Sequence, residues 1–186
     1  MIRIVAAAFL CLTFASPAFA ATKWKVAPDA KAITWQATQA GGSFEGACSA
    51  FDADVAFDPA DLATSSVIVR IDMAKCLTGE TTKDTYLPQV PWFDVASFPQ
   101  ATFEAKKFRH IKGDDYVADG SLTLKGVTKP VSLPFTLAID GKTAHVTGET
   151  TLQRLAFAVG DGAQLSAPSV AGPDVLVKID LKATKE

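Results

Sequence analysis

Alternation of apolar and polar residues is the feature that most restricts how this chain can fold, because it recurs along almost the whole length. A β-strand turns successive side chains to opposite faces, so a period of two predicts strands with one apolar face each. At least eight such strands are expected. The alternating stretches are 33–38, 51–57, 67–73, 102–108, 116–118, 121–124, 131–139 and 175–181.

The breaks between these stretches carry turn residues. Asp140-Gly141 predicts a hairpin whose two central residues form a type I′ turn. A connection of about five residues is expected after Leu124. Only 80–89 and 152–157 resist the alternation, and they predict one or two short helical or irregular segments.

About eight antiparallel strands must close into a barrel or fold into a sandwich to protect their edges. The successive hairpins near the C-terminus favour an all-β, up-and-down antiparallel β-barrel. The sandwich remains the alternative. No repeat or low-complexity linker divides residues 21–186, so a single domain is expected there.

The first twenty residues have the pattern of a secretory signal peptide. Arg3 precedes an apolar core from Ile4 to Phe14, and Ala18-Phe19-Ala20 supplies the small residues of a cleavage site. Cleavage after Ala20 and a periplasmic location are therefore expected. An uncleaved anchor is the weaker alternative, because the core is shorter than the roughly 20 residues of a membrane span.

Charge and cysteines restrict the partners and the compartment further. Without Arg3, 17 of the 18 basic residues remain against 20 acidic ones, and no basic cluster predicts nucleic-acid binding. Cys48 and Cys76 remain after cleavage, and in an oxidising compartment they are expected to form a disulfide. Two separate buried thiols are the alternative.

The residue patterns of catalysis and of metal binding are missing from the sequence. His110 and His145 have no spacing that predicts a shared metal, and no nucleophile elbow, paired-cysteine motif or phosphate-binding loop occurs. We therefore expect neither an enzyme nor a metal or other cofactor. The many phenylalanines fit a packed barrel as well as a hollow one, and periodicity does not separate the two.

Several stretches resemble, in order and spacing, the YceI-like family of exported polyisoprenoid-binding proteins. They are 43–72, 82–105, 119–135, 155–162 and 172–183, with "LTLKGVTKPV" and "WFDVASFPQATF" the most distinctive. The resemblance implies a lipocalin-like barrel that binds, transports or stores a polyisoprenoid, such as a quinone tail, or another long-chain amphiphile. Lys83 and Asp84 match the family, but Tyr86 stands where the family usually has a histidine. The two cysteines are not part of the family pattern.

The resemblance and the alternation together define an expected cavity lining, with core packing alone as the alternative for each residue. Pro88, Pro91 and Pro99 around Trp92 and Phe93 predict a semi-rigid segment at the mouth. Transient contact with a membrane or membrane protein, and a monomer or homodimer, both fit such a carrier. The rival functions are an accessory module of a respiratory or cytochrome system with a packed barrel, and an enzyme acting on the lipid. The expected lining residues are Phe44, Phe51, Val55, Val69, Ile71, Trp92, Phe93, Phe98, Phe103, Leu122, Leu124, Leu133 and Phe135.

Overall fold

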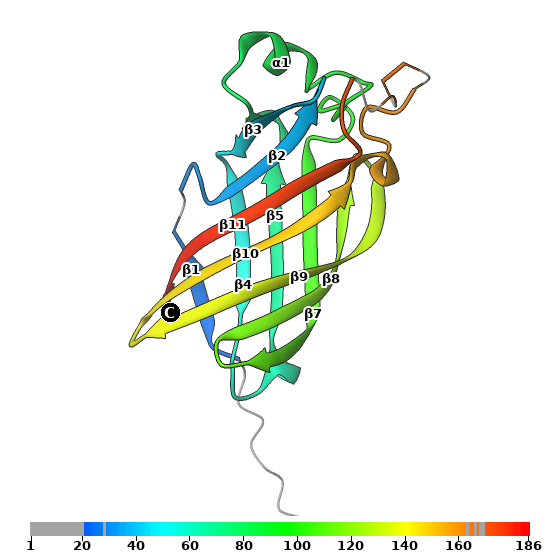
Figure 1. The fold of residues 1–186 in the computed structure, drawn as a ribbon. Coiled ribbons are helices and arrows are strands. Elements are labelled where there is room, and N and C mark those ends of the chain that lie inside the picture. Colours follow the sequence, from blue (N-terminus) through cyan, green and yellow to red (C-terminus); the bar gives the residue numbers. More distant parts are fainter. Residues whose placement is uncertain (1–20, 28, 163, 166, 168–169) are drawn as a thin grey trace, which may run out of the picture.

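A computed structural model describes residues 21–27, 29–162, 164–165, 167 and 170–186. The expected signal peptide, 1–20, lies outside the described residues. Within the described residues, eight antiparallel strands form a closed barrel, because β1 pairs with both β4 and β11 (Figure 1). The predicted barrel is thus confirmed. Around the ring the strands are β1 (Lys23–Val26), β4 (Phe51–Ala56), β5 (Ser66–Asp72), β7 (Gln100–Lys112), β8 (Asp115–Leu124), β9 (Val127–Asp140), β10 (Thr143–Gln153) and β11 (Asp174–Lys185).

Three further strands extend one end of the barrel. The long strand β11 pairs with β1 near its C-terminus and with β2 (Ile33–Gln39) through residues 176–179. The hairpin of β2 and β3 (Gly42–Cys48) continues into β6 (Cys76–Leu77). The helix α1 (Thr81–Tyr86) lies at this same end of the molecule (Figure 1). Short 3-10 turns complete the chain at Leu62–Thr64, Met73–Lys75 and Arg154–Phe157.

Two turns differ from the sequence prediction. The connection after β8 has two residues, Lys125 and Gly126, because the strand β9 already begins at Val127. Both turn residues have positive φ, 50° and 75°, as a tight hairpin of this twist requires. After β9 the central residues are Gly141 and Lys142, one position later than predicted, and Gly141 alone of these two has positive φ.

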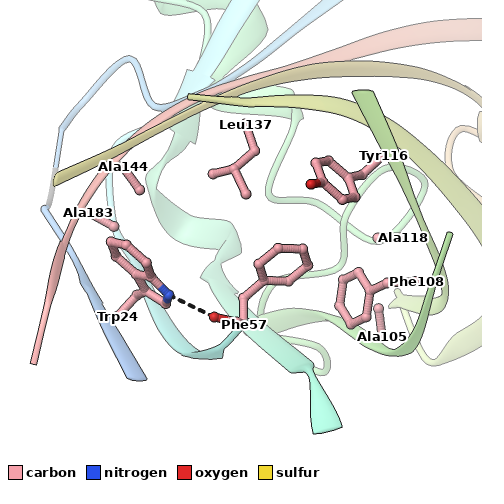
Figure 2. Close-up of a cluster of buried hydrophobic side chains, with 9 residues drawn as sticks. All are labelled: Trp24, Phe57, Ala105, Phe108, Tyr116, Ala118, Leu137, Ala144 and Ala183. Carbon is pink, nitrogen blue, oxygen red and sulfur yellow. Dashed lines mark hydrogen bonds between the residues drawn. The ribbon is translucent and has the colours of Figure 1, made fainter. Parts of the chain in front are cut away.

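The barrel is packed solid at the end away from α1. Phe57, which follows β4, places its ring edge-on to Phe108, Tyr116 and Phe135 at centroid distances of 5.3, 5.7 and 6.0 Å. The Trp24 indole Nε1 donates to the Phe57 carbonyl oxygen at 3.0 Å (Figure 2). The buried members of this cluster are Trp24, Phe57, Ala105, Phe108, Tyr116, Ala118, Leu137, Ala144 and Ala183.

Candidate ligand-binding site

The α1 half of the barrel encloses a cavity of about 650 Å³. Inward-facing side chains of β2, β3, β5, β7, β8, β9, β10 and β11 form its wall, and the wall is almost entirely apolar. A volume of this size lies within the range of about 300 to 1,000 Å³ that small-molecule sites occupy. Of the predicted lining residues, the structure brings nine together here: Phe44, Val69, Ile71, Trp92, Phe93, Phe103, Leu122, Leu124 and Leu133.

Four predicted lining residues lie elsewhere. Phe51 packs against the buried cluster that contains Cys48 and Cys76. Val55 and Phe135 pack against the cluster at the end of the barrel away from α1. Phe98 lies against the Gly126 turn, where an added Cβ would come within 2.6 Å of the ring. The alternation gives the face of the strand correctly, but it does not show at which height along the barrel the interior is empty.

The prediction also missed part of the wall. The alternation predicts the strands β2 and β11, but the predicted lining includes none of their residues. Their apolar positions complete the wall opposite β7 and β8. The missed residues with clear strand alternation are Ile33, Trp35, Ala37, Val175, Val177 and Ile179.

Polar residues of α1 and its neighbours form the rim. Tyr86, with 55% of its surface exposed, contributes to the cavity beside Glu80 and Lys83. The Lys83 ammonium pairs with Glu80 and lies 4.8 Å from the centre of the Phe44 ring. The end of the cavity nearest α1 can therefore contact a polar group, whereas most of the wall behind it is apolar.

Asp84, the other residue shared with the family pattern, has a structural role in this chain. Its carboxylate accepts hydrogen bonds from the Thr78 backbone N–H at 2.7 Å, the Thr78 hydroxyl at 2.8 Å and the Gly79 N–H at 3.0 Å. The bond from the Thr78 backbone is the largest cause that lowers the pKa of Asp84. Asp84 thus fixes the approach to α1 and with it the position of the rim.

Arg154 is a buried cation in the cavity wall, and it holds in place the described parts of the loop that follows it, at residues 159–160, 165 and 171–172. Only 5% of the residue is exposed, and burial lowers its pKa. All five guanidinium N–H groups donate to backbone carbonyl oxygens, and the ring of Trp92 lies 5.9 Å from the guanidinium carbon. The acceptors are Val159, Gly160, Leu165, Ala171 and Gly172, at 2.7 to 2.9 Å.

The segment 88–99 lies against the same loop. Its residues Trp92 and Phe93 line the cavity, and the Pro91 carbonyl accepts a hydrogen bond of 2.6 Å from the Gly160 N–H. Lys125 Nζ donates to the Ala158 carbonyl at 2.7 Å and to the Pro91 carbonyl at 3.3 Å. The proline-rich segment is therefore tied to the barrel on two sides.

Trp35 lines the cavity with its indole over Gly46 of the neighbouring strand. A Cβ at Gly46 would lie 2.2 Å from the indole Cζ2, so the close packing requires glycine. The Phe44 ring meets the indole edge-on at 5.7 Å. The Trp35 Nε1 is buried and has no hydrogen-bond partner among the described residues.

Cys48 and Cys76 form a disulfide that links β3 to β6 within the cavity wall. The two residues are directly opposite in the register, with their Cα atoms 3.9 Å apart. Both line the cavity, and Met73 packs beside them. The bridge connects the β2–β3 extension to the segment that leads into α1.

No cluster of three or more metal-ligating side chains occurs in the part of the chain that the structure describes. His110 and His145 are both exposed, and neither lines the cavity. His145 Nε2 lies 2.8 Å from Asp180 Oδ1 on the outer face. Among the described residues, no helix is long and apolar enough to cross a membrane.

The fold and the site define a class of antiparallel β-barrel with an apolar pocket in its interior. The YceI-like domain matches residues 24–183, and the chain belongs to this family. A UPF0312 protein of Yersinia pestis is 38% identical over 96 residues, which are 52% of this chain and 50% of that protein. A UPF0312 protein of Photorhabdus laumondii is 36% identical over 92 residues, 50% of this chain and 47% of that protein. The chain thus spans about half the length of these curated relatives.

Solved structures share this fold. BcnA of Burkholderia cenocepacia is 34% identical with a TM-score of 0.78, over 82% of this chain and 95% of that chain. A polyisoprenoid binding domain from Saccharophagus degradans is 12% identical with a TM-score of 0.68, over 89% of this chain and 99% of that chain. The second likeness shows the fold alone.

Proposed function

We propose that this protein binds a polyisoprenoid, such as a quinone tail, or another long-chain lipid in its barrel cavity. The observation that carries the proposal is a cavity of about 650 Å³ whose wall is almost entirely apolar and whose rim is polar. Such a wall suits a hydrocarbon chain, and the rim suits a small polar end group. Membership of the family and the shared fold with a polyisoprenoid binding domain support the same ligand class.

The energetics of burial allow useful affinity. Each buried methylene contributes about 0.8 kcal/mol, so a chain of about 20 carbons would gain about 16 kcal/mol. Association costs about 4 to 15 kcal/mol in lost freedom, before the ordering of the chain itself. The free energy gained by burying a long chain therefore exceeds the cost of association, whereas the gain from a chain of about five carbons does not.

We propose that the protein acts without catalysis as a carrier or store, in the periplasm, after removal of residues 1–20. The described lining contains no histidine, and its carboxylate, Glu80, is paired with Lys83. The cavity argues against the rival function of an accessory module with a packed barrel. Replacement of His110 or His145, which lie outside the cavity, should leave ligand binding and the chemical identity of the bound lipid unchanged.

Organic extraction of natively purified protein, followed by mass spectrometry, tests the proposal. Val177 faces the cavity, whereas its neighbour Lys178 is exposed on the outer face. We expect Val177→Phe to reduce the amount of extracted lipid several-fold, because the larger side chain fills the cavity. Lys178→Phe is the matched control and should retain the lipid. Absence of lipid from the wild type, together with no uptake of an isoprenoid quinone, would refute the proposal.

A further inference from the structure

We infer that an aromatic floor closes the cavity at the end of the barrel away from α1, here called the lower end. We also infer that this floor sets the length of the lipid chain that the protein prefers. The inference rests on the proposed function, since it specifies which members of the ligand class fit. The aromatic floor consists of Phe57, Phe108, Tyr116 and Phe135, from three strands and the segment after β4.

The boundary between the empty and the packed interior can be located on β7, β8 and β9. On each of these three strands, one inward-facing residue lines the cavity, and the inward-facing residue two or four positions away along the strand is packed in the core. The packed residues belong to the cluster in Figure 2 or contact it. The last lining residue and the first packed one are Phe103 and Ala105 on β7, Leu122 and Ala118 on β8, and Leu133 and Phe135 on β9.

The floor is built to stay closed. Tyr116 and Phe135 are directly opposite each other on β8 and β9, and their rings stack at 5.6 Å. Phe57, Phe108 and Tyr116 are each less than 9% exposed. Small residues, Ala105 among them, give these rings room inside the barrel. A chain that enters beside α1 therefore meets packed aromatic rings instead of a second exit.

The volume above the floor limits the ligand. A group the size of a water molecule occupies about 30 Å³, so the cavity of about 650 Å³ holds about 20 carbon-sized groups. This corresponds to about four isoprenoid units. With the lower end closed, the chain must enter tail first, and its polar end remains near Glu80, Lys83 and Tyr86 at the rim.

The test is a titration of the purified protein with isoprenoid quinones of about two to eight units. Quenching of tryptophan fluorescence measures binding during the titration. For the wild type, Kd should fall at least about tenfold per added unit up to about four units, and change less than about twofold beyond. The chain length beyond which Kd no longer falls is here called the plateau. Phe135→Ala removes about six carbons from the floor, so the plateau should begin at a chain about one isoprenoid unit longer. Leu133→Phe adds volume to the cavity lining, so the plateau should begin at a shorter chain.

Leu137→Ala is the matched control, because Leu137 lies one alternation below Phe135 on the same strand and within the packed cluster. It should lower stability and leave the plateau in place. If Phe135→Ala does not fold, Phe135→Leu gives the same comparison with a smaller shift. Tight binding with an unmoved plateau in the Phe135 and Leu133 variants would overturn the floor as the length determinant. Failure of the wild type to bind any quinone would instead refute the proposed function.

Discussion

Replacement of Arg154 by methionine should destabilise the protein far more than the same change at Arg109. Arg109 forms a two-point ion pair with Asp119, with its Nε 2.6 Å from Oδ2 and its second contact at 3.1 Å, but half of its side chain is exposed. Arg154 instead donates five hydrogen bonds to backbone carbonyl oxygens, four of them buried and the one to Leu165 partly buried. At about 1 kcal/mol for each bond, their loss is worth about 5 kcal/mol.

Relief of the buried charge offsets part of that loss. We therefore expect Arg154→Met to lower the free energy of unfolding by about 3 to 5 kcal/mol, and Arg109→Met by at most about 1 kcal/mol. Urea unfolding at neutral pH measures both values. The Gly160 amide lies in the loop that Arg154 holds, and it donates a hydrogen bond to the Pro91 carbonyl. Its hydrogen exchange should be faster in Arg154→Met than in the wild type.

A third variant separates the shape of the guanidinium from its charge. Arg154→Lys retains the charge but offers three donors without the planar fork, so it should recover less than half of the lost stability. If the lysine variant is as stable as the wild type, the positive charge alone stabilises the loop. Equal losses at Arg154 and Arg109 would refute the reasoning altogether.

Three further predictions concern stability. Reduction of Cys48–Cys76 should lower the free energy of unfolding by about 3 to 4 kcal/mol in urea titrations, and an unchanged midpoint would contradict this. Hydrogen bonds from Arg109 and then Ser132 lower the pKa of Asp119 to about 2. Because its folded pKa is depressed, its stabilisation is present above about pH 4 and is lost as pH falls through 2, so the deficit of Asp119→Asn should shrink over that window. Gly46→Ala should displace the Trp35 indole, lower stability by about 2 to 4 kcal/mol and shift tryptophan emission, whereas unchanged emission would show that the strands move instead.

The sequence predicts the barrel because period-two alternation is a local property of each strand. Pairing between distant strands is not local, so the ladder from β1 to β4 and β11 had no signal in the residues. The same limit explains Phe135, whose apolar face was predicted correctly while its height in the barrel was not. Whether an inward side chain meets a void or another ring depends on all the strands at that level.

Arg154 shows a second limit. A single arginine in an irregular segment resembles a surface residue, and its role depends on five carbonyl oxygens that only the folded loop brings together. Trp92 and Phe93 were easier to predict, since a pair of aromatics between prolines is unusual for an exposed loop. Residues with local signals were thus recognised, and those defined by distant backbone groups were missed.

A crystal structure grown with a quinone of about four isoprenoid units tests the central claim most directly. The account predicts continuous chain density from Tyr86, past Trp92, to Leu133, with the quinone ring at the α1 end and no density below Phe135. Density for the quinone on the outer surface, or a barrel interior filled by its own side chains, would contradict it.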